Sequence, residues 1–258
     1  MATDYEQILT FAVSLGEVML RSGAETYRVE DTISRILSVH NFEQVDTFVT
    51  PTGITTSISG HNMPICTLLR RVKHRSNRLD KIEYLNQLSR DYVMGKLTLE
   101  QATIKVHEID NIAPYSPNTI ILITGFSAGS FSLMFHGGVV EFFVSFVIGF
   151  FSAVVHKFLA DRGVINYLAL FLVSFTIGSS VMVLHNIVAD VINVDSITTG
   201  CVMTLVPGVI FTNAIRDTIG EELLSGISRA VEALTIAIVI AVGICIPMFL
   251  GLQVGGGL

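Results

Sequence analysis

The chain has 258 residues, of which 50% are hydrophobic and 15% charged, and its formal net charge is −6. Soluble domains carry about a quarter charged residues, so this composition excludes a wholly soluble enzyme. The acidic balance provides no basic stripe for phosphates, which excludes a nucleic-acid-binding protein. The three cysteines are far apart, odd in number and lack C-x-x-C spacing, so neither a disulfide framework nor a zinc cluster is suggested. No metal and no cofactor is expected.

Charged residues are unevenly distributed along the chain. Residues 1–116 hold 12 Lys/Arg and 14 Asp/Glu, whereas residues 117–258 hold 4 and 8. This division predicts a water-exposed domain at 1–116 and a transmembrane domain at 117–258. The first residues lack the cationic start and apolar core of a secretory signal, which predicts an N-terminus in the cytoplasm.

The first domain is predicted to be α+β. Apolar residues recur there at helical spacing, β-branched residues dominate one stretch, and a capping box opens the last helix. The expected elements are helices at 4–21, 25–40 and 80–94, two or three strands within 45–72, a turn at 60–62, and a short last helix that begins at the capping box of Thr98 and Gln101.

Five apolar stretches approach the length needed to cross a bilayer core of about 30 Å. They lie at about 117–135, 139–159, 164–184, 196–212 and 230–252. All 16 Lys and Arg fall before the first stretch or near the connections after the second and the fourth. Cytoplasmic loops retain such residues. The sequence therefore predicts a five-helix bundle in the cytoplasmic membrane, with the N-terminus inside and the C-terminus outside.

The fourth stretch contains Pro207-Gly208, which should interrupt helical hydrogen bonding at membrane depth. Broken helices of this kind form substrate sites in many secondary transporters. A proline-kinked structural helix is the alternative. Small and hydroxylic residues, Thr204 among them, crowd the first, third and fourth stretches, where they favour close helix packing, a polar path, or both.

Polar residues follow the interruption. Asn213 and Asp217 are four apart and share a helix face, with Arg216 on its flank. No ATP-binding loop occurs, so active transport would draw on an ion gradient or another subunit. We expect the Asn213 amide and the backbone at Pro207-Gly208 to contact substrate. Asp217 is the first candidate for the coupling proton, and Glu141 and Glu232, near the ends of their stretches, are the next.

Two separated motifs carry a resemblance to a known family. They comprise Gly23, Ala24 and Glu25 in the first domain, and Pro207, Gly208, Asn213, Asp217, Gly226 and Arg229 in the second. In these positions the chain resembles the threonine/serine exporter family, and the likeness covers nearly its whole length. One departure is that Glu221 stands where the family usually has a glycine, so the short loop there is expected to differ in shape.

The resemblance implies export of small polar metabolites driven by the proton motive force. Shorter members are similar to the larger subunit of a split exporter that works with a second membrane protein of about five spans; succinate is an attested cargo of such pairs. Self-association could also complete the five spans. The competing hypotheses are a membrane-anchored metabolite sensor, whose first domain binds the ligand, and a hydrolase. No nucleophile with an evident base supports the hydrolase, so an enzyme is not expected.

Overall fold

The computed structural model describes residues 4–61, 63–73, 75–188 and 192–255, and the chain divides into two compact units. The α/β unit comprises residues 1–113 and 209–231, and the helical unit comprises residues 114–208 and 232–258. The first unit thus includes a segment that the sequence analysis assigned to the transmembrane domain. The contacts responsible are described below.

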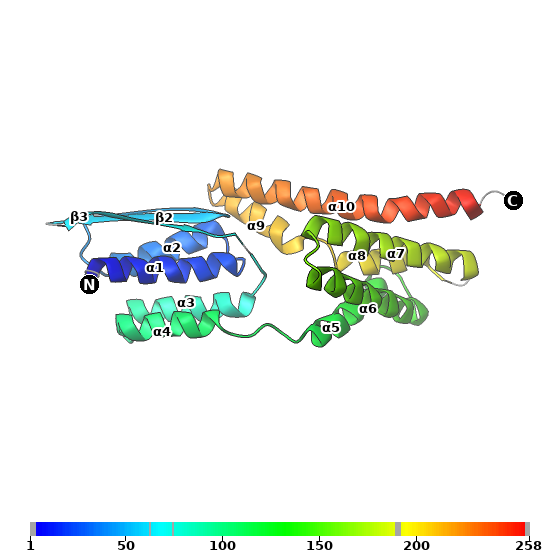
Figure 1. Cartoon of the computed structure of the whole chain (residues 1–258), viewed down its shortest axis with the longest axis horizontal. Helices are drawn as coiled ribbons and strands as arrows, with labels where there is room; N and C mark the ends of the chain where they lie inside the picture. The colour runs from blue at the N-terminus through cyan, green and yellow to red at the C-terminus, as the bar shows by residue number, and fades with distance from the viewer. Residues whose placement is uncertain (1–3, 62, 74, 189–191, 256–258) are drawn as a thin grey trace. The chain divides into compact units, whose positions relative to one another are not determined.

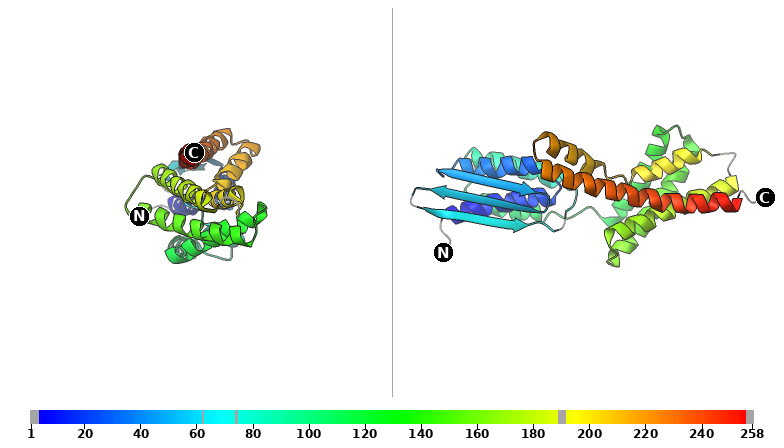
Figure 2. Two further views of the ribbon diagram at one scale, coloured as in Figure 1. Left: turned by 90° about the vertical axis from the view of Figure 1, so that its right-hand side faces the viewer. Right: turned by 90° about the horizontal axis from the view of Figure 1, so that it is seen from above.

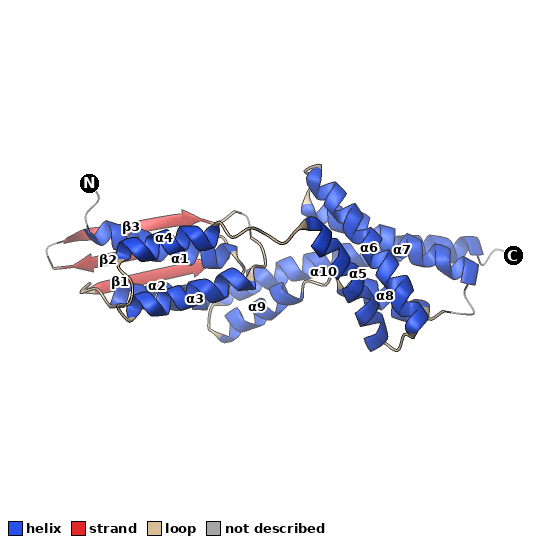
Figure 3. Ribbon diagram, turned by 90° about the horizontal axis from the view of Figure 1, so that it is seen from below, coloured by secondary structure: helices blue, strands red, loops and turns tan. Residues whose placement is uncertain are grey.

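The α/β unit is layered. The helices α1 and α2 contact both the sheet and the pair α3 and α4, so they form the middle layer (Figure 1). All four helices lie on one face of the sheet (Figure 3). The bounds are α1 Asp4–Arg21, α2 Thr26–Ser38, β1 Gln44–Thr50, β2 Gly53–Gly60, β3 Met63–Arg71, α3 Leu79–Val93 and α4 Leu99–Asp110.

The described strands form an antiparallel sheet in the order β1-β2-β3, as the right-hand view of Figure 2 shows. Val49, Ile54 and Ile58 are buried beneath it, whereas Phe48 and Ile65 are exposed on strands of the same sheet. Alternating side chains point to opposite faces, so one face joins the apolar core. The expectation of two or three strands is confirmed in this region; residue 62 of the predicted turn lies outside the described residues.

The helical unit contains α5 Pro117–Met134, α6 Val139–Asp161, α7 Asn166–Val188 and α8 Val194–Met203. A further helix, α9, spans Gly208–Ile219, and α10 spans Leu223–Gly255. Within the described residues, α6, α7 and α10 are long and apolar enough to cross a membrane, and α8 with α9 would make a fourth span, bent by 60°. The first expected span, α5, does not meet that test, so five spans stay a prediction.

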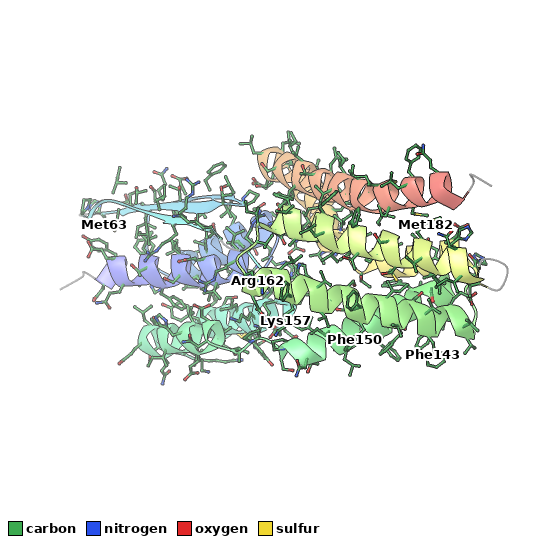
Figure 4. The ribbon with its side chains drawn as sticks, turned by 45° about the vertical axis from the view of Figure 1, so that its right-hand side comes forward. Met63, Phe143, Phe150, Lys157, Arg162 and Met182 are labelled. Carbon is green, nitrogen blue, oxygen red and sulfur yellow. The ribbon has the colours of Figure 1, made fainter. Side chains whose placement is uncertain are left out.

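Apolar side chains cover the outside of the helical unit. Phe126, Phe143 and Phe150 are exposed, as are many aliphatic residues of the same helices. Figure 4 shows Phe143 and Phe150 along α6, with Lys157 and Arg162 toward one end of that helix. Apolar surface of this extent is unsuited to water and suits lipid.

Glycines allow the helices of this unit to approach closely. A Cβ on Gly125 would lie 2.9 Å from the Phe146 carbonyl oxygen, and one on Gly129 would lie 2.8 Å from that of Phe142. Both contacts join α5 to α6. The small residues of the first stretch therefore serve helix packing, which is one of the two roles expected for them.

Candidate functional site

The loop between α1 and α2 is the first component of the candidate site. Gly23 ends α1 with φ +96°, the left-handed conformation that glycine adopts at low cost. The amide of Ala24 donates to the carbonyl of Met19 at 3.1 Å, and that of Gly23 to Leu20 at 3.1 Å. This helix end turns the backbone so that the carbonyls of Gly23 and Ala24 are available to other partners.

Helix α9 supplies two of those partners from its polar face. Nδ2 of Asn213 donates to the carbonyl oxygen of Gly23 at 2.9 Å. The backbone N–H of Thr26, the first residue of α2, donates to Oδ1 of Asp217 at 3.0 Å. The N-cap residue Glu25 makes no side-chain cap of its own, so Asp217 caps α2 from 191 residues away. A carboxylate at a helix N-terminus also has a favourable interaction with the helix dipole.

The start of α10 adds a buried cation. Nη2 of Arg229 donates to the carbonyl of Ala24 at 2.8 Å, and its Nε lies 2.9 Å from Oδ2 of Asp217. The exposed fractions are 3% for Arg229 and 0% for Asp217. Breaking a buried pair by removing one partner typically costs about 3–5 kcal/mol, because the other charge is left uncompensated.

Glu25 forms the outer edge of this arrangement. Its Oε1 lies 2.6 Å from Nη1 of Arg216, and its Oε2 lies 3.1 Å from Nε of Arg28. Burial by itself raises the pKa of Glu25, but its own backbone N–H, the Arg216 hydrogen bond and the two cations outweigh burial and lower the pKa below 4.5. The Arg216 side chain is 54% exposed, so solvent screens this pair.

We call these residues the loop–helix cluster. Its members are Gly23, Ala24, Glu25, Thr26, Asn213, Arg216, Asp217 and Arg229. All of them belong to the α/β unit. Their shared feature is that side chains of α9 and α10 hold the backbone and carboxylate of the α1–α2 loop.

The turn between α9 and α10 brings Arg229 back toward Asp217. The amide of Glu222 donates to the carbonyl of Asp217 at 2.9 Å, and Glu221 adopts φ +68°. Glu221 therefore takes the left-handed conformation that glycine favours. A Cβ on Gly226 would overlap the hydroxyl of Thr218, so this glycine allows the two helices to pack closely.

The remaining predicted site residues lie at the helix break and belong to the helical unit. Residues 204–207 are non-helical between α8 and α9, which confirms the predicted interruption. Thr204 donates to the carbonyl of Cys201 at 2.7 Å. Nothing lies within 4 Å of a Cβ placed on Gly208, so close packing does not explain that glycine.

The cluster groups its residues differently from the sequence analysis. From the sequence, Gly23–Glu25 were placed in one domain and Asn213, Arg216 and Asp217 beside a membrane path, whereas the structure brings these residues together in the α/β unit. The assignment of 209–231 to the transmembrane domain differs for the same reason. Sequence reasoning also missed Thr26, although a helix start without its own capping side chain was a usable signal.

Glu141, outside the cluster, has a structural role. Glu141 accepts from the backbone N–H of Gly138 at 2.7 Å and of Asn193 at 2.9 Å, so it fastens the start of α6 to the segment before α8. Among the described residues, no group of three or more His, Cys, Asp and Glu side chains could hold a metal ion.

The apolar helices and the broken α8–α9 segment characterise a multi-pass membrane protein. Residues 10–251 match the family ThrE, described as "Putative threonine/serine exporter". The match spans nearly the whole chain, and the protein belongs to the threonine/serine exporter family. Comparisons with curated proteins and with solved structures give no match.

Proposed function

We propose that the protein is a secondary-active exporter subunit that moves small polar metabolites out of the cytoplasm. The family match over residues 10–251 carries this proposal. Threonine and serine are the first candidate cargoes, and dicarboxylates such as succinate are the second.

The break between α8 and α9 supports a transport role. The two helices are bent by 60° at residues 204–207, where backbone groups leave the helical pattern. Non-helical backbone at membrane depth persists only beside protein or water, and its free carbonyls and helix ends bind solutes in many secondary transporters. A simple membrane anchor needs no such break.

The orientation follows from charge. Lys157 and Arg162 gather at one end of α6 (Figure 4), and the Lys and Arg of residues 1–113 belong to the α/β unit. Because cytoplasmic loops retain such residues, we place the N-terminus in the cytoplasm and the C-terminus outside. With five spans, the subunit would be completed by a second small membrane protein or by a second copy of itself.

We propose that the loop–helix cluster holds α9, the helix that follows the break. Asn213, Asp217 and Arg229 each bond to backbone of residues 23–26. These bonds tie the orientation of α9 to the α1–α2 loop. The role of Asp217 as the coupling carboxylate would require these bonds to open during transport.

Asp217→Asn tests whether Asp217 carries the coupling proton, and the double variant D217N/R229Q, which leaves no buried charge unpaired, controls for the lost ion pair. Asparagine keeps an oxygen that can accept from the Thr26 N–H but cannot ionise. If Asp217 carries the coupling proton, D217N at normal membrane level abolishes protonophore-sensitive export. Undiminished export by D217N would remove the coupling role and leave the holding role.

The proposed function is tested by efflux of labelled threonine, serine and succinate from cells expressing the chain, with and without a candidate small partner and a protonophore. Export that needs the partner and collapses with the protonophore supports a split proton-coupled exporter. No efflux of any of the three solutes, with the protein confirmed in the membrane, would overturn the proposal.

A cavity in the α/β unit favours the metabolite sensor as a second candidate. It has a volume of about 840 Å³ and lies between α1 and α4, with Thr10, Ser14 and His107 in its lining. A solute that raises the Tm of the full chain, an effect abolished by Ser14→Phe, would support the sensor when efflux is absent.

A further inference from the structure

A second cavity lies in the helical unit beside the helix break. Its volume is about 470 Å³, within the range of about 300–1,000 Å³ typical of small-molecule sites. Residues of α5, α6 and α7 line it, together with Thr204 and Leu205 of the break. The break therefore opens onto a space large enough for a metabolite.

The charge in this cavity is cationic. Of its described lining residues, Lys157 is the only one that is an Asp, Glu, Lys or Arg. Nζ of Lys157 lies 3.5 Å from Oδ2 of Asp161, outside the lining, and its side chain is 43% exposed. An ammonium group has three N–H donors, so one such contact leaves donors for a bound carboxylate.

Hydroxyl groups line the same cavity, and their protons are already engaged. Thr124 donates to the Ile120 carbonyl at 2.8 Å, Ser152 to Gly149 at 2.8 Å, and Thr204 to Cys201 at 2.7 Å. A hydroxyl that donates to its own helix keeps its oxygen lone pairs. These oxygens can therefore accept hydrogen bonds from a ligand's ammonium or hydroxyl.

We propose that this cavity binds a small α-amino acid, with its carboxylate on Lys157 and its ammonium or hydroxyl group on the oxygens of Thr124, Ser152 and Thr204. The proposal rests on the proposed function and gives its substrate a site. Apolar lining residues such as Ile121 and Val173 suit a methyl group. A dicarboxylate fits less well, because its second carboxylate would need a protonated His156.

The carboxylate contact is tested with a pair of probes. The full-length chain is placed in phosphatidylcholine nanodiscs, which contain no anionic lipid, and binding of L-threonine and of L-threonine methyl ester is measured. We expect the wild type to prefer threonine by about tenfold or more, because the ester lacks the charged group. Lys157→Ala should bind the two probes alike, and Lys157→Arg should keep part of the preference.

Arg162→Ala is the matched control. Arg162 is a cation of the same helix end but stacks on Phe158 at 4.0 Å and does not line the cavity. R162A should therefore keep the wild-type preference for threonine over its ester. Equal Tm values for K157A and wild type would show that the fold is intact.

The outcomes separate the site from the function. If the wild type exports threonine and K157A exports it equally well, or keeps the preference for threonine over its ester, the site is wrong and the function stands. Tighter binding of succinate than of threonine would overturn the amino-acid assignment. A wild type that exports none of the solutes overturns the proposed function and the site with it.

Discussion

The loop–helix cluster and the cavity beside the helix break use polar residues in opposite ways. In the cluster, Asp217 and Arg229 are buried, face each other and bond to backbone of residues 24–26. In the cavity, the cation of Lys157 is part-exposed and hydroxyl oxygens retain acceptor capacity. Buried polar groups that pair with one another hold a structure together, whereas groups with spare hydrogen-bonding capacity can bind a solute. Substitutions in the cluster should therefore reduce stability, and substitutions in the cavity should alter binding.

The largest expected effect is on the buried ion pair. Arg229→Ala leaves the Asp217 carboxylate buried without its cation and should lower the free energy of unfolding by about 3–5 kcal/mol. Thermal unfolding in detergent and the membrane level measure this. The double variant D217N/R229Q, which leaves no buried charge, should be less damaging than R229A. An R229A protein with wild-type Tm would contradict the holding role and remove the contrast with the cavity.

The close approach of α9 and α10 should give the next largest effect. Gly226→Ala places a methyl group against the Thr218 hydroxyl and should destabilise by about 1–3 kcal/mol. Gly208→Ala is the control, because its Cβ position is open. T218A should partly restore the stability of G226A. Equal Tm values for G226A and G208A would show that α9 and α10 can move apart without loss of stability.

The next prediction concerns how much the single hydrogen bond from the Asn213 amide to the Gly23 carbonyl contributes to stability. Asn213→Ala removes the donor to the Gly23 carbonyl and should cost about 1 kcal/mol in denaturant unfolding. Asn213→Asp should cost more, because a carboxylate would then face that carbonyl oxygen. The reverse order would mean that the Gly23 carbonyl is satisfied without Asn213.

The contribution of Glu25, at the edge of the cluster, to folding stability should depend on pH. The pKa of Glu25 is lowered in the folded protein, so its ionised form adds stability above the ordinary value of 4.5, and this contribution is lost as pH falls through the lowered folded pKa. Glu25→Gln should therefore be less stable than wild type near neutral pH, with the difference shrinking in acid. Denaturation curves between neutral and acidic pH would show it. A stability difference between Glu25→Gln and wild type that does not change with pH would mean that the charge of Glu25 makes no net contribution to stability.

The smallest expected effect is an increase in stability. Glu221 holds φ +68°, so Glu221→Gly relieves backbone strain and should stabilise the protein by up to about 1 kcal/mol in the same unfolding assay. Glu222→Gly is the control, because Glu222 is not among the described non-glycine residues with positive φ. A loss of stability in E221G would show that the Glu221 side chain makes a stabilising contact that outweighs the strain.

Local sequence patterns predicted much of the fold. The helix over residues 4–21, the strands within 45–72 and the interruption at Pro207-Gly208 all agree with the structure, because periodicity, β-branched residues and proline act over a few neighbours. The motif residues of the cluster were also identified. The contact between them was not predicted, because Gly23 and Asn213 are 190 residues apart and helix periodicity does not tell which helix packs on which loop.

The charged first part, the apolar helices and the broken fourth stretch could be predicted from residue order, because solvent preference and helix propensity are properties of each segment. The capping of α2 by Asp217, the membership of α9 in the α/β unit and the cavity that Lys157 and Thr204 share became visible only in the folded chain. Those outcomes depend on which donors and acceptors satisfy one another after the chain has packed. Each buried donor needs an acceptor, and that acceptor can belong to a residue far away in the sequence.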